Sequence, residues 1–188
     1  MRKTLLSVLV IFILTSLSKI QAQSDEYSEE RPIAFKASYT GDVVNSYPGG
    51  IKRGSGYLGM INLGISLDTR NAGLWTGGEF FLNAANTHGS RPSGDLIGDY
   101  QGVSNIEAGN LTFLHELWYK QTLGNFSLLA GLQDLATGFA SSDYGALFLN
   151  GSFGVHSTIA HNVPAPVFPL TALGLQLQWR FSDAFTAK

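Results

Sequence analysis

Hydrophobic and polar residues alternate with a period of two along much of this chain, most clearly from Thr171 to Phe181. The odd positions are mostly large and apolar, namely Leu173, Leu175, Leu177, Trp179 and Phe181, and the residues between them are Gly174, Gln176, Gln178 and Arg180. Successive side chains of a strand point to opposite faces, so this pattern predicts a β-strand with one apolar and one polar face. Its length suits a tilted membrane-crossing strand, which needs roughly 9–11 residues.

Earlier stretches repeat this alternation and predict further strands, at 33–43, 55–68, 75–86, 110–121 and 126–135. A turn at 182–183 leads into a last strand that begins at Phe185. The predicted fold class is therefore all-β, an antiparallel sheet of six to seven strands.

Three positions disturb the pattern. Phe81 falls on the polar side of its strand, and Leu129 shares a side with Ser127 and Gln133, which leaves the facing of the fifth strand ambiguous. The fourth strand is predicted to place Leu111, Phe113, Leu117 and Tyr119 opposite Asn110, Thr112, Glu116 and Lys120, with His115 as an unexplained exception on the apolar side.

The predicted connections alternate in length, with longer ones at 45–54, 87–109 and 136–170 and shorter ones at 69–74, 122–125 and 182–183. Outer-membrane barrels have short periplasmic turns and longer extracellular loops. Aromatic residues gather beside the short turns, as in a belt at a membrane boundary: Trp75, Tyr119, Phe126, Trp179, Phe181 and Phe185. The alternative is a secreted sandwich with a dry core, but its strands would be shorter and such long loops unusual. The pattern favours the membrane barrel.

The first residues predict export. Arg2 and Lys3 precede an apolar run that ends near Leu17, and a plausible cleavage site follows Ala22, so residues 1–22 are interpreted as a signal peptide, with a membrane anchor as the alternative. Residues 23–32 are acidic and unpatterned, and are interpreted as a flexible leader. The formal net charge is −2, and removal of the basic signal peptide makes it more negative, which argues against nucleic acid as a partner. The chain has no cysteine and hence no disulfides.

Catalytic and metal-binding patterns are weak. The four histidines, His88, His115, His156 and His161, do not reproduce a zinc spacing. Asp95 with Asp99, or Glu107 with Glu116, could serve as a glycosidase pair, although loop carboxylates are usually only solvated. The segment GSGYLG at 54–59 lacks the features of a phosphate-binding loop, and no nucleophile elbow is present. We expect no enzyme and no cofactor.

Six phrases of the chain are distinctive: GGIKRGSGYLGMINLGISLD at 49–68, GDYQGVSNIEA at 98–108, LHELWYKQ at 114–121, LLAGLQDL at 128–135, ALFLNGSFG at 146–154 and FPLTALGLQLQWR at 168–180. In this order they resemble a known family, the carbohydrate-selective porins of the OprB type. The resemblance implies a Gram-negative outer-membrane barrel of about sixteen strands that admits glucose and related sugars by passive diffusion. Since six strands cannot close such a barrel, residues 33–188 are expected to be its amino-terminal part, an incomplete open curved sheet. Expected partners are mono- or small oligosaccharides and outer-membrane lipid, with a homo-oligomer left open.

The polar faces of the predicted strands supply candidates for lining a pore, where hydrogen-bonding and charged groups set selectivity. They are Lys36, Asp42, Asn62, Glu79, Asn83, Glu116, Lys120, Gln176, Gln178 and Arg180. The alternative for each is a solvated wall residue without a special role. The apolar segment 146–162 is expected to pack against the inner wall and narrow the lumen, with a flexible extracellular loop as the alternative.

Two further functions stay open at this point. One is an exported carbohydrate-binding β-domain that does not transport sugars, and the other is an outer-membrane glycan hydrolase. Membrane fractionation distinguishes a porin from the former, and glycan cleavage by the purified protein identifies the latter.

Overall fold

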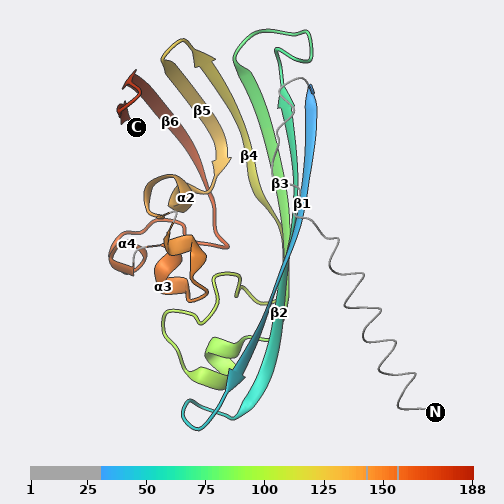
Figure 1. Cartoon of the computed structure of the whole chain (residues 1–188), viewed down its shortest axis with the longest axis vertical. Coiled ribbons are helices and arrows are strands. Elements are labelled where there is room, and N and C mark those ends of the chain that lie inside the picture. The colour runs from blue at the N-terminus through green and yellow to red at the C-terminus, as the bar shows by residue number, and fades with distance from the viewer. Residues whose placement is uncertain (1–30, 143, 156) are drawn as a thin grey trace, which may run out of the picture. The chain divides into compact units, whose positions relative to one another are not determined.

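The computed structural model describes residues 31–188 except 143 and 156, so the predicted signal peptide and nearly all of the predicted leader lie outside the described residues. Seven antiparallel strands form one open, curved sheet in chain order (Figure 1). They are β1 (Ile33–Ser46), β2 (Gly54–Asp68), β3 (Gly78–Gly89), β4 (Leu111–Leu123), β5 (Phe126–Gln133), β6 (Ala172–Ser182) and β7 (Phe185–Ala187). The predicted fold class is confirmed.

Short helical elements occupy the two longest connections. They are η1 (Ser93–Ile97), α2 (Leu135–Phe139), η2 (Gly145–Leu147), α3 (Gly151–Gly154) and α4 (Ser157–Asn162). Figure 1 shows these connections on the concave side of the sheet. Among the described residues, no helix has the length and apolar character needed to span a membrane.

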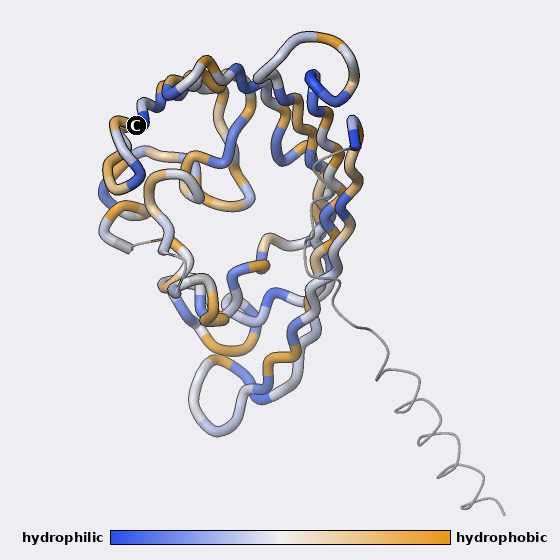
Figure 2. Tube along the Cα trace, turned by 45° about the horizontal axis from the view of Figure 1, so that its top comes forward, coloured by the Kyte–Doolittle hydropathy of each residue, from blue (hydrophilic) through white to orange (hydrophobic). Residues whose placement is uncertain are grey.

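The strand register keeps apolar side chains on one face across the sheet. One cross-strand row joins Phe35, Ile65, Leu82, Leu117, Leu132 and Leu173. The neighbouring residues on each strand belong to the other face, which carries the helical connections and is called the concave face below. The apolar side is called the convex face. The alternation is visible along the strands in Figure 2.

A β-bulge explains the exceptional position of His115. Asn83 pairs with Glu116 but Ala84 pairs with Leu114, so His115 is an extra residue without a partner in the β3–β4 ladder. A bulge reverses the facing of everything on one side of it. Leu114 therefore lies on the convex face, whereas Phe113 lies on the concave face. The predicted facing of the first part of this strand, including Thr112 on the polar side, is wrong for that reason.

The register also settles the facing of β5. Leu128 pairs with Leu177 on the convex face, whereas Leu129 pairs with Gln176 on the concave face. The strand ends at Gln133, two residues earlier than predicted, because Asp134 caps α2. The 134–171 connection therefore leaves the wall along its concave side.

The predicted alternation of connection lengths holds for the later connections but not for the first. The β1–β2 loop at 47–53 is shorter than the β2–β3 turn at 69–77. The short first loop is held by η1, because the Leu96 carbonyl accepts hydrogen bonds from the backbone N–H groups of Ile51 (2.9 Å) and Lys52 (3.0 Å). The contrast between long loops and tight turns thus depends on 90–110 and 134–171.

The small buried core lies on the concave side, beneath these connections. Its apolar members are Leu58, Met60, Ala85, Leu96, Ala136 and Ala140. The large convex side chains remain exposed, for example Phe35 at 77% and Leu173 at 83%. A water-soluble sheet buries such a row, so the convex face requires an apolar environment.

Candidate functional site

All ten predicted pore-lining residues lie on the concave face. The register pairs Lys36 with Gly64, Ser38 with Asn62, and Asn83 with both Gly64 and Glu116. Five of the ten surround a central cavity: Lys36, Asn62, Asn83, Glu116 and Gln176. The other five lie nearer the two ends of the strands. Their role as pore lining is a prediction that the geometry allows.

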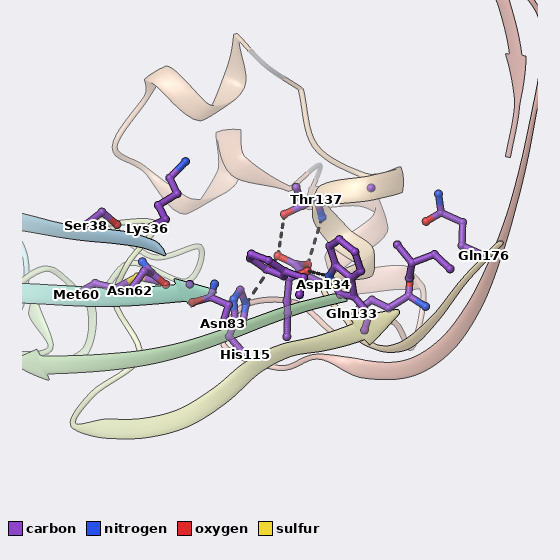
Figure 3. A pocket seen from close by; sticks show the side chains of 16 residues that line it. Lys36, Ser38, Met60, Asn62, Asn83, His115, Gln133, Asp134, Thr137 and Gln176 are labelled. Atoms are coloured by element: carbon purple, nitrogen blue, oxygen red, sulfur yellow. Dashed lines mark hydrogen bonds and ion pairs between the residues drawn. The ribbon is translucent and has the colours of Figure 1, made fainter. Parts of the chain in front are cut away.

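The central cavity has a volume of about 530 Å³ and lies between the strand wall and α2. In Figure 3, Lys36, Asn62 and Asn83 extend from neighbouring strands on one side of Asp134, and Gln176 lies on the other. The volume of this cavity falls within the range of small-molecule sites, about 300–1,000 Å³. Apolar residues that the sequence pattern did not select also line it, namely Met60, Phe81, Trp118 and Leu129.

The helix α2 is fixed beside this cavity by its N-cap. The Asp134 carboxylate accepts hydrogen bonds from the backbone N–H groups of Ala136 (3.0 Å) and Thr137 (3.2 Å) and from the Thr137 hydroxyl (2.7 Å). His115 lies beneath it, with Nε2 3.9 Å from Asp134 Oδ2, and its ring meets that of Phe168 edge to face. The bulge residue thus contacts both ends of the 134–171 connection, which holds that connection against the wall.

A second group of candidates lies toward the short turns. Lys120 Nζ is 3.6 Å from Glu79 Oε2, and the two side chains are 38% and 35% exposed. Gln178 and Arg180 line a smaller cavity of about 170 Å³ together with Lys120. Positive and negative groups are therefore interspersed at this end of the concave face.

Asp42 lies at the opposite end and holds a loop. Its Oδ2 accepts a hydrogen bond from the Ser104 hydroxyl at 2.7 Å, which ties β1 to the 90–110 connection. Within that connection, Glu107 accepts from the Ser93 hydroxyl at 2.6 Å and from the Ser93 backbone N–H at 3.1 Å. The loop is thus closed on itself and anchored to the wall.

The two long connections contact each other through their backbones. The Asn105 N–H donates to the Leu149 carbonyl (2.8 Å), and the Gly151 N–H donates to the Gly102 carbonyl (2.9 Å). The segment 146–162 therefore contacts the neighbouring loop, and Phe148 and Phe153 stay more than half exposed. Packing of this segment against the inner wall stays a prediction.

The convex face is bounded by aromatic and polar groups at both ends. Beside the short turns, Trp75 Nε1 donates to the Tyr119 hydroxyl at 2.9 Å, and Phe126 packs edge to face on Trp179. At the loop end, Tyr39 contacts both the Tyr57 hydroxyl and His88 Nε2, which the alternation alone did not reveal. Glycine at position 59 makes room there, because an added Cβ would lie 2.6 Å from the Tyr39 hydroxyl.

The weak catalytic candidates serve structural roles or lie apart. Glu107 organises its loop, and Asp99 accepts from the Gln101 N–H and the Asn150 side chain. His156 lies outside the described residues. Among the residues described, no group of three or more His, Asp or Glu side chains could hold a metal ion.

An antiparallel wall with an apolar outer face, a polar inner face and long loops folded to the inside defines the porin class of protein. The profile of the carbohydrate-selective porin, OprB family, matches residues 52–188. The chain belongs to this family.

The fold matches that of a solved protein. A structure of OprB from Pseudomonas putida, determined at high pH, superposes with a TM-score of 0.71 at 24% sequence identity. The match covers 82% of this chain and 39% of that chain, so the chain spans well under half of the solved protein. At this identity the likeness shows the fold. No curated protein matches the chain.

Proposed function

We propose that this chain forms part of the wall of a water-filled outer-membrane channel through which glucose and related sugars diffuse passively. The observation that supports the proposal best is the separation of the two faces. Every polar candidate lies on the concave face, and the opposite face presents a continuous apolar surface between two aromatic boundaries. That arrangement suits lipid outside and water inside.

We further propose that residues 33–188 are the amino-terminal part of a longer, closed barrel that is exported by the signal peptide at 1–22. Among the described strands, β1 pairs only with β2 and β7 only with β6. Unpaired backbone groups in hydrocarbon cost several kcal/mol each, so these edges need partners before the sheet can reside in a bilayer. Further strands of the same protein supply them most simply.

The mechanism requires no catalytic group. A neutral, hydroxylated solute enters such a passage when the wall replaces part of its hydration by hydrogen bonds, and it leaves because no single contact is strong. Amide and carboxylate groups such as Asn62, Asn83, Glu116 and Gln176 provide these contacts around the central cavity. Glu79 and Lys120 carry opposite charges and lie close together, so they produce no strong electrostatic field of one sign in the passage.

The decisive experiment is sugar flux into liposomes that contain the complete protein. Liposomes with the protein should take up D-glucose faster than empty ones, in linear proportion to the concentration gradient when that gradient is low. Protein that stays soluble after cell fractionation and does not accelerate uptake would contradict the proposal and favour an exported carbohydrate-binding domain.

The contacts between the two long connections support the proposal that these connections narrow the passage. The segment 146–162 is hydrogen-bonded to the 101–105 part of the other loop on the concave side. We expect deletion of 146–162 to raise the single-channel conductance of the complete protein. An unchanged conductance would show that the segment lies outside the passage.

A further inference from the structure

Two cross-strand aromatic side chains lie on the concave face of the sheet, among the polar candidates. Phe81 of β3 and Trp118 of β4 are cross-strand partners on the concave face, with ring centroids 5.0 Å apart and an interplanar angle of 33°. One residue away on the same strands, Phe80 and Tyr119 form the equivalent pair on the convex face, with centroids 4.6 Å apart. The convex pair fits an apolar boundary, but the concave pair needs a different explanation.

The concave rings lie against the wall. Position 64 on the neighbouring strand is glycine, and a Cβ added there would lie 3.5 Å from Cε2 of Phe81, so the ring covers the strand at this point. The Trp118 indole is oriented by a hydrogen bond, since its Nε1 donates to Glu116 Oε1 at 3.2 Å. Both side chains are half-buried, and both line the central cavity.

Hydrogen-bonding groups surround this aromatic surface. Asn62, Asn83 and Gln176 line the same cavity, as do Glu116 and Gln133. Within the described part of the chain, Asn83 Oδ1 and Gln133 Nε2 are buried atoms without a hydrogen-bond partner. One is an acceptor and the other a donor, and buried polar groups of this kind are normally satisfied by a ligand or by water.

We propose that Phe81 and Trp118 form a stacking surface for a pyranose ring inside the channel, a saccharide-binding subsite in the wall. The C–H groups on one face of a pyranose make a weakly positive apolar surface, which complements the negative face of an aromatic ring. The hydroxyl groups at the edge of the sugar meet the amide and carboxylate groups around the cavity. This inference rests on the proposed function and adds the chemical basis on which one sugar ring is retained.

The stacking surface distinguishes a ring from an open chain. D-Sorbitol has the hydroxyl groups of a hexose but no rigid C–H face, so it gains less from stacking. In planar bilayers that contain the complete protein, glucose should reduce the ion current at a lower half-saturating concentration than sorbitol. Replacement of both aromatic residues, Phe81→Leu with Trp118→Leu, should raise the half-saturating glucose concentration about tenfold and remove the preference over sorbitol.

Matched controls separate stacking from a structural role. Phe80→Leu with Tyr119→Leu alters the adjacent convex pair and should leave glucose block unchanged. The single variant Trp118→Phe keeps an aromatic face and should retain the preference for glucose. Leucine at both concave positions removes the aromatic faces but keeps apolar side chains that do not narrow the passage, so the current without sugar should not fall.

Different experimental results would contradict the saccharide-binding subsite and the proposed function. Channels that conduct ions but neither respond to glucose nor admit it into liposomes contradict the proposed function itself. Saturable glucose block that survives in the concave double variant, or wild-type channels that treat glucose and sorbitol alike, overturns the subsite alone. The second comparison needs no variant, so the inference can be refuted even where the double variant fails to assemble.

Discussion

Leu63 provides a direct test of which face contacts lipid. It lies on the convex face of β2, pairs with Ala37 and Ala84, and is 53% exposed. The convex positions of β2 run from Tyr57 to Leu67. At about 3.4 Å per residue and a tilt of about 40°, that stretch covers about 25 Å along the membrane normal, which matches the apolar band of such barrels. Leu63 therefore lies near the middle of the bilayer.

Leu63→Arg should destabilise the inserted protein by about 2–4 kcal/mol, the cost of a cation on the lipid face near the midplane. Leu67→Arg, close to the boundary, should cost about 0–1 kcal/mol by the same depth dependence. Asn62→Arg places the same charge one residue away on the concave face, where water is expected to solvate it, and should cost less than Leu63→Arg. Because positions 62 and 63 are adjacent on one strand, the difference between the costs of their arginine variants reports the environments of the two faces.

The assay is reversible denaturant unfolding of the complete protein in phospholipid vesicles. Repeating it with shorter-chain lipids should reduce the cost of Leu63→Arg, because a thinner bilayer brings position 63 closer to water. Equal costs at positions 62 and 63, or a cost that does not vary with lipid thickness, would refute the assignment of the convex face to lipid.

Three further changes test separate parts of the account. Tyr119→Phe removes the acceptor of the Trp75 indole and the hydroxyl that donates to Gln121 Oε1, and should lower stability by about 0.5–1.5 kcal/mol in the same unfolding assay; an unchanged stability would show that these two contacts contribute nothing. Lys120→Met leaves Glu79 without its cation, and should change stability by less than about 1 kcal/mol while shifting the reversal potential in a salt gradient toward cation preference. An unshifted potential would remove Lys120 from the passage. Glu107→Ala removes the side-chain hydrogen bonds that close the 90–110 loop on itself and should speed cleavage of the loop by added protease, whereas an unchanged cleavage rate would show that other contacts hold it.

The faces of the regular strands could be predicted because residues that pair across an antiparallel sheet lie on the same face. Once Leu175 and Gln176 are assigned to opposite faces, the register extends that assignment through Ala130 and Leu129 to the strands before them. This is why ten residues chosen from separate strands lie on one face of the sheet. It is also why a single inserted residue, His115, was sufficient to reverse the facing of Leu111 and Phe113.

The rest of the site depends on contacts that the alternation does not encode. The hydrogen bond from Ser104 to Asp42 joins positions far apart in sequence, and nothing local to either residue indicates it. Phe81 departs from the alternation of its strand, and a large aromatic residue on a polar face is itself a signal of a special role. Its cross-strand partner Trp118 shows that the exception is shared by two strands, which only the register reveals.

The central claim is that the convex face contacts lipid and the concave face contacts water. Residues 1–188 contain no cysteine, so Leu175→Cys or Gln176→Cys adds one site for a spin label within them, and any cysteine elsewhere in the complete protein is replaced by serine. In lipid vesicles, the label at position 175 should be more accessible to dissolved oxygen, and the label at position 176 more accessible to a water-soluble nickel chelate. If both labels are shielded from both reagents, the two faces are packed in protein and the channel account is wrong.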